Sequence, residues 1–172
     1  MESISKYELR GIAFLVRHFS TPHTIRQIAL KLGISPPGLH KGFKKLEEAG
    51  LIKAQRFGSG VLYQVDLDNA AARHLAGLAL LLGSKTIPEA DQLSQAGRMA
   101  IRKGDRILLV TDTHHEVSAE KYKITTLSSE AFALRLRQRD KETTAFIEDG
   151  DVLFGEDTLL HTIKNSTYPL GQ

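Results

Sequence analysis

Apolar residues recur at intervals of three and four along the first third of the chain, a spacing that predicts helices. The first helix is expected over about residues 5–19. Ser5 and Glu8 have the spacing of a capping box at its start. Thr24 and Gln27 form a second such pair, which predicts that another helix begins there.

A third helix is expected directly after a tight turn. Gly33 suits the left-handed position that closes the second helix. Ser35 is then the expected cap of the third helix, and Pro36 takes a first-turn position where a missing N–H is not lost from the helix. The inward positions of this helix are Leu39, Phe43 and Leu46. Its other sides carry polar and basic residues, and its end is expected at Gly50.

The period then changes to that of strands. The runs "LIKAQRF" and "VLYQVDL" flank the turn "GSG", and β-branched and aromatic residues around a glycine turn predict a β-hairpin. The tip of this hairpin carries residues 56–60. A helix follows over 69–83, apolar almost all round, which predicts burial against the rest of the chain or a second copy.

The second half predicts a layer of helices and strands. Another helix is expected over about 88–103, with Leu93, Ala96, Met99 and Ala100 facing inward. The continuous apolar run at 106–111 predicts a strand covered on both faces, and 122–127 predicts a second strand.

The last quarter of the chain continues this alternation. Ser128 is the expected cap of a helix over "SSEAFALRLRQRD". "TAFIED" and "DVLFGED" are expected to be short strands or a turn between them, and "TLLHTI" a final helix.

The fold class predicted from these elements is α+β. We expect three parts: residues 1–68, a linker or dimerisation helix at 69–86, and a small α/β domain at 87–172. An apolar fraction of 41% with 25% charged residues is typical of globular proteins. No apolar run reaches the length of a membrane span, the start lacks the pattern of a signal peptide, and there are no cysteines. These features predict a cytoplasmic protein without a membrane partner.

Charge separates the two halves. Residues 1–66 hold ten Lys and Arg against five Asp and Glu, whereas the other residues hold thirteen against fifteen. A basic half joined to a mildly acidic half indicates a polyanionic partner for the first half.

Helix, helix, short turn, helix and hairpin is the element order of a winged helix-turn-helix. The stretch "TIRQIALKLGISPPGLHKGFKKLEEAGLI" followed by "GSGVLYQVD" resembles the winged-helix transcription regulators of the MarR and ArsR type, especially archaeal ones. The resemblance covers about residues 5–66 and implies a domain that binds double-stranded DNA. In such a domain the second helix of the motif enters the major groove and the first crosses the backbone.

The candidate DNA-binding residues lie on these elements. Lys41, Lys44 and Arg56 are expected to neutralise phosphates, and Thr24 to hold a phosphate at a helix start. Ser35 and His40 are candidates for base edges. The full predicted set is Thr24, Arg26, Gln27, Ser35, Pro37, Gly38, His40, Lys41, Lys44, Lys45, Arg56 and Ser59. Gly38 and Gly42 weaken the helix and would permit close approach of its backbone to DNA.

The second half is similar to the later part of minimal nucleotidyltransferase domains, through "KGDRILLVTD", "KITTLSSEAFALRLRQRD" and "FIEDGDVLFGEDTL". That chemistry requires paired aspartates for divalent metal and a Gly-Ser phosphate loop. Here Asp105 precedes the strand and Asp112 follows it, and the "GSG" at 58–60 belongs to the hairpin tip. The resemblance therefore implies a degenerate, non-catalytic domain without a cofactor.

One cluster permits a metal-binding alternative: Asp112, His114, His115 and Glu116 in "DTHHE". Adjacent histidines on an extended segment point to opposite sides, which favours a solvated polar loop. The arginines at 135, 137 and 139, with Lys141, are most simply a solvated helix face.

The sequence thus predicts a homodimeric transcription regulator, with a second domain for dimerisation, partner binding or ligand sensing. The alternatives are a nucleotidyltransferase with relocated carboxylates and a winged-helix adaptor for protein contacts.

Overall fold

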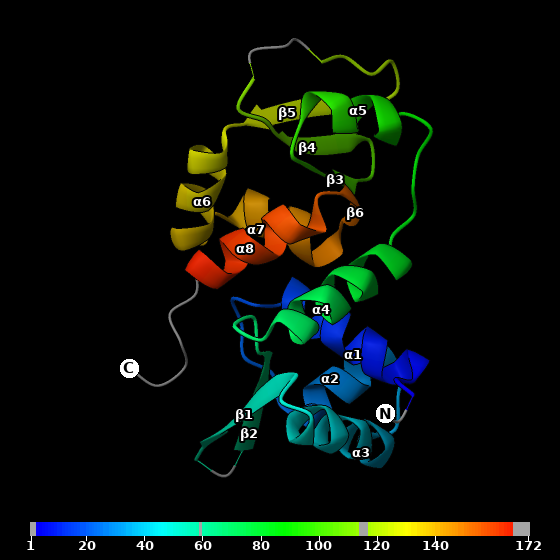
Figure 1. Ribbon diagram of the computed structural model, residues 1–172, viewed down its shortest axis with the longest axis vertical. Helices are drawn as coiled ribbons and strands as arrows, with labels where there is room; N and C mark the ends of the chain where they lie inside the picture. The colour runs from blue at the N-terminus through cyan, green and yellow to red at the C-terminus, as the bar shows by residue number, and fades with distance from the viewer. Residues whose placement is uncertain (1–2, 59, 114–116, 167–172) are drawn as a thin grey trace. The chain divides into compact units, whose positions relative to one another are not determined.

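The computed structural model describes residues 3–58, 60–113 and 117–166 (Figure 1). The chain divides into two compact units, and the boundary between them lies between Ala79 and Leu80. The predicted fold class is confirmed: helices followed by a β-hairpin, then a small sheet with helices.

The first unit begins with three helices, α1 (Lys6–Arg17), α2 (Ile25–Leu32) and α3 (Pro36–Glu48). Both predicted capping boxes are present, because Ser5 caps α1 with Glu8 and Thr24 caps α2 with Gln27. Gly33 closes α2 in the left-handed conformation, at φ 64°. Ser35 occupies the cap position of α3, but its side chain makes no capping hydrogen bond.

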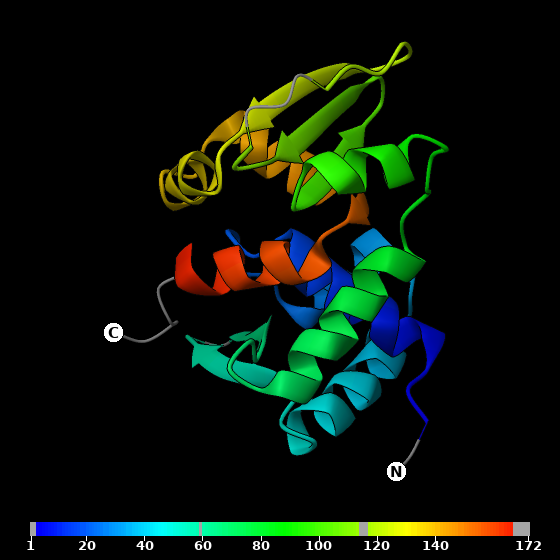
Figure 2. The same cartoon turned by 45° about the horizontal axis from the view of Figure 1, so that its top comes forward.

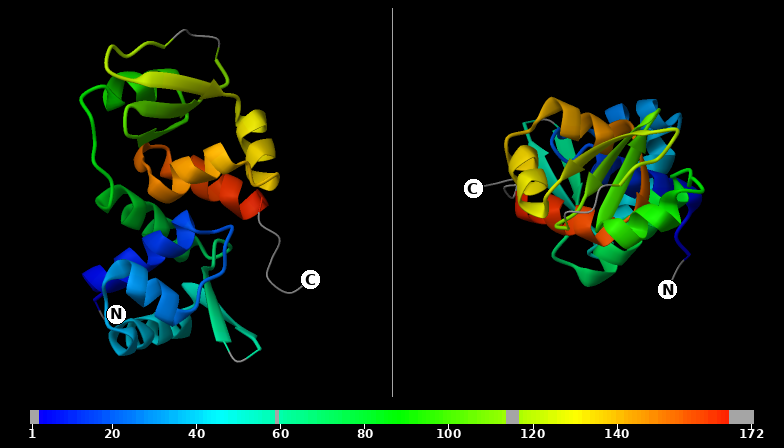
Figure 3. Two further views of the ribbon diagram at one scale, coloured as in Figure 1. Left: turned by 180° about the vertical axis from the view of Figure 1, so that it is seen from behind. Right: turned by 90° about the horizontal axis from the view of Figure 1, so that it is seen from above.

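The hairpin that follows consists of β1 (Ile52–Phe57) and β2 (Gly60–Val65), which pair antiparallel. Its strands lie beside the three helices when the first unit is seen from behind (left view of Figure 3). Two contacts fix the middle of β2 to the helices. The ring of Tyr63 packs edge-on against Phe43 of α3, 5.2 Å between centroids. Leu62 forms an isolated β-bridge with Thr24 at the start of α2.

The core of the first unit forms where α1 crosses α3. The predicted inward residues of α3 are all buried: Leu39, Phe43 and Leu46. Gly11 of α1 faces the Phe43 ring, and a Cβ atom on Gly11 would overlap the edge of that ring. A glycine at this position therefore lets the two helices approach closely.

Helix α4 (Ala70–Leu82) follows the hairpin. Asn69 holds its start, since its side-chain oxygen accepts from the backbone N–H of Ala71 at 2.9 Å. Burial of this helix was expected, against the rest of the chain or against a second copy, and within the single chain only part of it is buried. Its buried residues include Ala72, Ala76, Ala79 and Leu80. The leucines at 78, 81 and 82 are 50%, 37% and 67% exposed.

The second unit is built on a sheet in the order β5-β4-β3-β6. Its strands are β3 (Met99–Lys103), β4 (Arg106–Val110), β5 (Lys123–Leu127) and β6 (Asp151–Phe154). β3 pairs antiparallel with β4 and β6, while β4 and β5 pair parallel. The strands run side by side in Figure 2.

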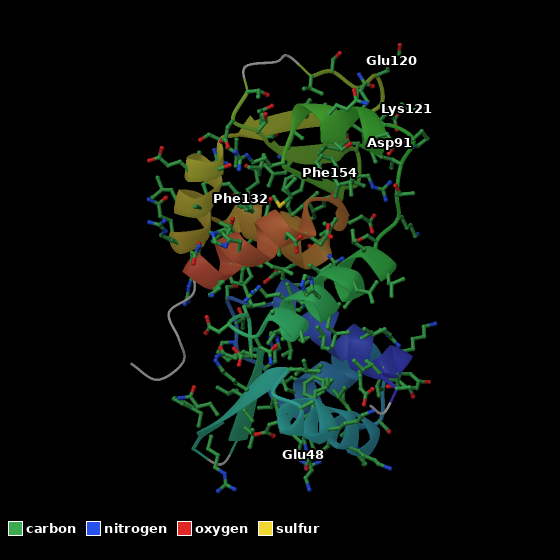
Figure 4. The ribbon with its side chains drawn as sticks, viewed as in Figure 1. Glu48, Asp91, Glu120, Lys121, Phe132 and Phe154 are labelled. Atoms are coloured by element: carbon green, nitrogen blue, oxygen red, sulfur yellow. The ribbon has the colours of Figure 1, made fainter. Side chains whose placement is uncertain are left out.

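Helices pack against this sheet. α5 (Ala90–Ala96) covers the face that displays Ala100, Ile107 and Leu109. The other helices of this unit are α6 (Ser129–Arg137), α7 (Lys141–Asp149) and α8 (Glu156–Ser166). They bring Phe132, Phe146 and Leu159 into the core, each no more than 2% exposed. Phe132 is labelled on α6 in Figure 4.

The predicted helix over 88–103 is wrong in its second half. α5 ends at Ala96, and residues 99–103 form β3 instead. Gly97 adopts an extended conformation, and a Cβ there would lie 3.0 Å from the Val110 carbonyl oxygen. The chain can turn against β4 at this point because residue 97 has no side chain. Pairing with strands on both sides then overrides the helical spacing of Met99 and Ala100.

The predicted strand or turn at "TAFIED" is also wrong, because these residues lie within α7. Asp140 caps that helix, and its carboxylate accepts from the backbone N–H of Thr143 at 2.9 Å. The buried residues Thr143, Phe146 and Ile147 have helical spacing. The short apolar run fits either kind of element, and burial on one helical side decides it.

None of the helices within the described ranges is both long enough and apolar enough to cross a membrane.

Candidate nucleic-acid interface

The outward side of α3 is the main candidate surface. Helical geometry places Pro37, Lys41, Lys44 and Glu48 opposite the buried stripe of this helix, and all four are exposed. Lys44 and Glu48 are an i,i+4 pair with 3.8 Å between Nζ and Oε1, and both side chains are about two-thirds exposed. Glu48 is labelled on α3 in Figure 4. Such an exposed pair contributes little to stability, so Lys44 is able to exchange Glu48 for a phosphate.

His40 lies on the flank of α3 that faces the hairpin. It lies on the same face of α3 as Glu47, which is seven residues, or about two helical turns, later. Burial raises the pKa of the Tyr63 hydroxyl on β2, and the charge of Glu47 raises it further. Glu47 is therefore close to Tyr63. His40 is itself exposed. His40 therefore lies on the side of α3 that faces the hairpin, not on the flank beside α1.

Lys45 lies on the opposite flank of α3, against α1. Its ammonium donates to the backbone carbonyl of Ser3 at 2.7 Å. It also lies 3.7 Å from the carboxylate of Glu8, whose side chain is only 7% exposed. Lys45 thus neutralises a buried carboxylate and ties the start of α1 to α3. We leave it out of the phosphate-binding set for that reason.

The two glycines of α3 have different surroundings. A Cβ on Gly42 would lie 2.9 Å from the Glu8 Cγ, so the space beside Gly42 is filled by α1. The expectation that Gly42 allows close approach to DNA is therefore wrong. Gly38 is exposed, and a Cβ there would meet only the hydroxyl of Ser35, at 2.9 Å.

The start of α2 presents a second group of candidate residues. Thr24 and Gln27 bond to each other: the Thr24 backbone N–H donates to the Gln27 side-chain oxygen at 2.8 Å, and the Gln27 N–H donates to the Thr24 hydroxyl at 3.4 Å. Their polar groups are already used by the capping box. Arg26 lies between them in sequence and is exposed, so it is the residue of this group best able to reach a phosphate.

The hairpin tip carries Arg56, which is exposed. Gly58 turns the chain there with φ 57°, a conformation that favours glycine. Ser59 lies outside the described residues. Phe57 is 77% exposed, and the sequence-based set omitted it. Its place beside a glycine turn, at the end of a strand, was the signal that could have identified it.

A groove of about 820 Å³ runs between the start of α1 and the outer side of α3. Its polar lining has hydroxyl, ammonium and carboxylate groups: Ser5, Glu8, Ser35, Lys41, Lys44, Lys45 and Glu48. Tyr7 also lines it and is 58% exposed, another residue that the sequence-based set omitted. The lining therefore has mixed charge, because Lys44 and Lys45 are paired there with Glu48 and Glu8, while Lys41 adds a further ammonium group.

The carboxylates of the second unit are separated. Asp105 and Asp112 flank opposite ends of β4, whose five residues alone span roughly 16 Å at about 3.3 Å per residue. Asp112 accepts from the Ser129 backbone N–H at 2.9 Å and lies 2.9 Å from the Arg98 Nε. These bonds, with the Ser129 N–H first, lower the pKa of the Asp112 carboxyl. The two aspartates do not form one metal site.

The histidines of "DTHHE" lie outside the described residues, as does Glu116. Among the residues that the structure does describe, no three His, Asp or Glu side chains are grouped so that they could hold a metal ion.

The first unit, with three helices, a tight turn before α3 and a hairpin behind it, has the winged helix-turn-helix fold. Residues 22–53 match the family model described as "Winged helix-turn-helix DNA-binding". Among solved structures, the chain is similar to a mutant of Lactococcus lactis ZitR, with 25% sequence identity, a TM-score of 0.36, and coverage of 55% of this chain and 73% of that chain. None of the curated proteins matches the chain.

The prediction of an amino-terminal winged helix-turn-helix is confirmed by this match. The resemblance of the second half to nucleotidyltransferases, and the archaeal type of the regulator, stay predictions.

Proposed function

We propose that this protein is a cytoplasmic transcription regulator that binds duplex DNA through α3 and the hairpin. The observation that carries the proposal is the exposed basic side of α3, at Lys41 and Lys44, in a segment that matches a winged helix-turn-helix DNA-binding model. A helix of this kind fits the major groove. The proposed regulator is of the MarR and ArsR type, and in particular of the archaeal type, as the sequence resemblance implies.

The proposed contacts form two groups. Lys41, Lys44, Arg26 and Arg56 are exposed cations that bind phosphates. The side of α3 between them offers Ser35, Pro37, Gly38 and His40 to base edges or sugars. Thr24 and Gln27 hold the start of α2 in place, where its free backbone N–H groups can meet a phosphate.

The protein is proposed to act as a homodimer. The exposed leucines of α4 are the basis of this proposal, because they form one apolar side without intervening charge. Two copies related by a two-fold axis would present two α3 helices to half-sites about one DNA turn apart. The second unit is proposed to be non-catalytic, with a role in dimerisation or in binding a partner or ligand.

The test is duplex binding measured against salt concentration. Lys41, Lys44 and Arg56 are replaced together by alanine, and the matched control replaces two lysines and one arginine of the second unit: Lys121, Lys141 and Arg137, all exposed. Lys121 is labelled in Figure 4. Both variants lose the same net charge.

The wild type and the control are expected to show the same steep fall in affinity with rising salt. The first variant should bind more weakly, and the slope of log affinity against log salt should be smaller in magnitude by about three, one for each lost phosphate contact. Equal slopes for both variants, or no binding by the wild type, would contradict the proposal. If the wild type binds a partner protein but has no affinity for duplex DNA, the adaptor alternative is supported instead.

A further inference from the structure

Phe57 is a large aromatic side chain at the outer end of the hairpin, and 77% of it is exposed. It pairs with Gly60 across the two strands, so no side chain on the facing position covers its ring. Arg56, one residue earlier, pairs with Val61 and points to the other face of the hairpin. An apolar ring and a cation thus flank the same tip on opposite faces.

The hairpin holds this tip in place relative to the helices. Its two strands pair in continuous register from Ile52 with Val65 to Phe57 with Gly60. The middle of β2 is fixed to α3 by the contact of the Tyr63 ring with Phe43, and to α2 by the bridge between Leu62 and Thr24. An aromatic group on such a support keeps its position when the helix beside it binds.

The charge of the first unit selects the partner. Residues 1–66 carry twice as many Lys and Arg as Asp and Glu. A protein partner for one exposed ring would not require that excess, whereas a duplex would. Arginines of minor-groove-binding proteins contact that groove, and phenylalanines insert from it between base steps and kink the duplex. Arg56 and Phe57 supply one of each.

We propose that Phe57 inserts between two base pairs from the minor groove and bends the DNA. The inference rests on the proposed function and deepens it. When α3 lies in the major groove, Arg56 holds the neighbouring backbone or groove edge and Phe57 enters the base stack. The preferred targets are pyrimidine–purine steps, because these unstack most easily.

The experiment compares the wild type with Phe57→Ala, Phe57→Leu and the control Leu30→Ala. Leu30 lies on α2 and is 84% exposed, so the control removes an equally exposed apolar side chain from the same unit. Short duplexes with a dye at each end report bending by energy transfer, and 2-aminopurine at a TA step reports unstacking. Thermal unfolding checks that all variants keep the wild-type stability.

The wild type and Leu30→Ala are expected to shorten the end-to-end distance and to raise 2-aminopurine fluorescence. Phe57→Ala should still bind the duplex, with an affinity reduced by less than about tenfold, because the free energy of unstacking the bases offsets part of the gain from inserting the ring. The duplex bound to this variant should stay straight and stacked. Phe57→Leu should retain part of the bend, since leucine also acts as a wedge.

Bending by Phe57→Ala equal to that of the wild type overturns this inference and leaves the proposed function intact. The same holds if wild-type protein binds without bending the duplex, or if Phe57→Ala changes only self-association. Absence of any wild-type binding overturns the proposed function, and the inference fails with it.

Discussion

At the scale of single residues, polar groups on α3 serve two different purposes. Lys45 is bonded to the start of α1 through Ser3 and Glu8, whereas Lys41 and Lys44 are exposed. Sequence spacing alone could not separate them, because all three lie outside the apolar stripe. The separation depends on where α1 crosses α3, and that crossing is set by contacts between residues far apart in the chain.

Replacing the two glycines of α3 by alanine is predicted to change the stability of the first unit in opposite directions. Gly42→Ala should lower the free energy of unfolding of the first unit by about 1–3 kcal/mol, since the new methyl group would press on the buried Glu8 side chain at 2.9 Å. Gly38→Ala should raise it by up to about 1 kcal/mol, because alanine favours helix and the nearby Ser35 hydroxyl can rotate away.

Denaturant unfolding of the two variants and the wild type measures both effects. Equal stability changes for the two substitutions would show that Gly42 has no close neighbour in solution. Gly38→Ala also reports on DNA, since its methyl group lies on the exposed side of α3. Weaker duplex binding without loss of stability would place that side in contact with the duplex.

At the scale of elements, local signals predicted the first unit well. Ser5 with Glu8, Thr24 with Gln27, and the left-handed Gly33 each depend on neighbours within a few residues, so the sequence alone could predict them. β3 and α7 were predicted wrongly for different reasons. Met99 to Lys103 becomes a strand only because β4 and β6 flank it. No pattern within those residues contains that pairing.

α7 shows which local signal was overlooked, and its cap supports a prediction about pH. The pKa of the Asp140 carboxyl is lowered, first by the Thr143 backbone N–H, then by the Thr143 hydroxyl, with a smaller effect of the Arg135 charge. Because the folded pKa is below the unfolded value of about 3.9, this stabilisation is present above that value and is lost as the pH falls through the folded pKa.

Asp140→Asn keeps a side-chain oxygen for the cap but removes its charge. The second unit of this variant should be slightly less stable near neutral pH than that of the wild type. This difference in the free energy of unfolding should disappear as the pH falls from about 5 to below about 3. Asp140→Ala should lose about 1 kcal/mol at neutral pH, because the cap itself is removed. Unfolding of each variant across this range measures both, and a constant difference between Asn and wild type would contradict the role of the charge.

At the scale of the whole molecule, the basic charge is confined to the first part of the chain, and the second part is mildly acidic. α4 connects the two units and is largely uncharged between His74 and Leu82. Its exposed leucines are therefore the feature through which we expect one copy to meet another. The duplex requires this if two half-sites are to be bound at once.

The dimer proposal is tested by Leu78→Ser with Leu82→Ser. These leucines are four residues apart on one side of α4, and they are 50% and 67% exposed, so replacing them removes apolar surface without opening the core. Each buried leucine contributes roughly 1.5–3 kcal/mol, so the dissociation constant of a dimer should rise by at least about a hundredfold.

Sedimentation measures the change, with Leu134→Ser as control, because Leu134 is 51% exposed on α6. A monomeric double variant should keep its affinity for one half-site and lose its preference for two. A double variant that remains dimeric would show that the copies meet elsewhere, and its duplex binding would then be the same as that of the wild type.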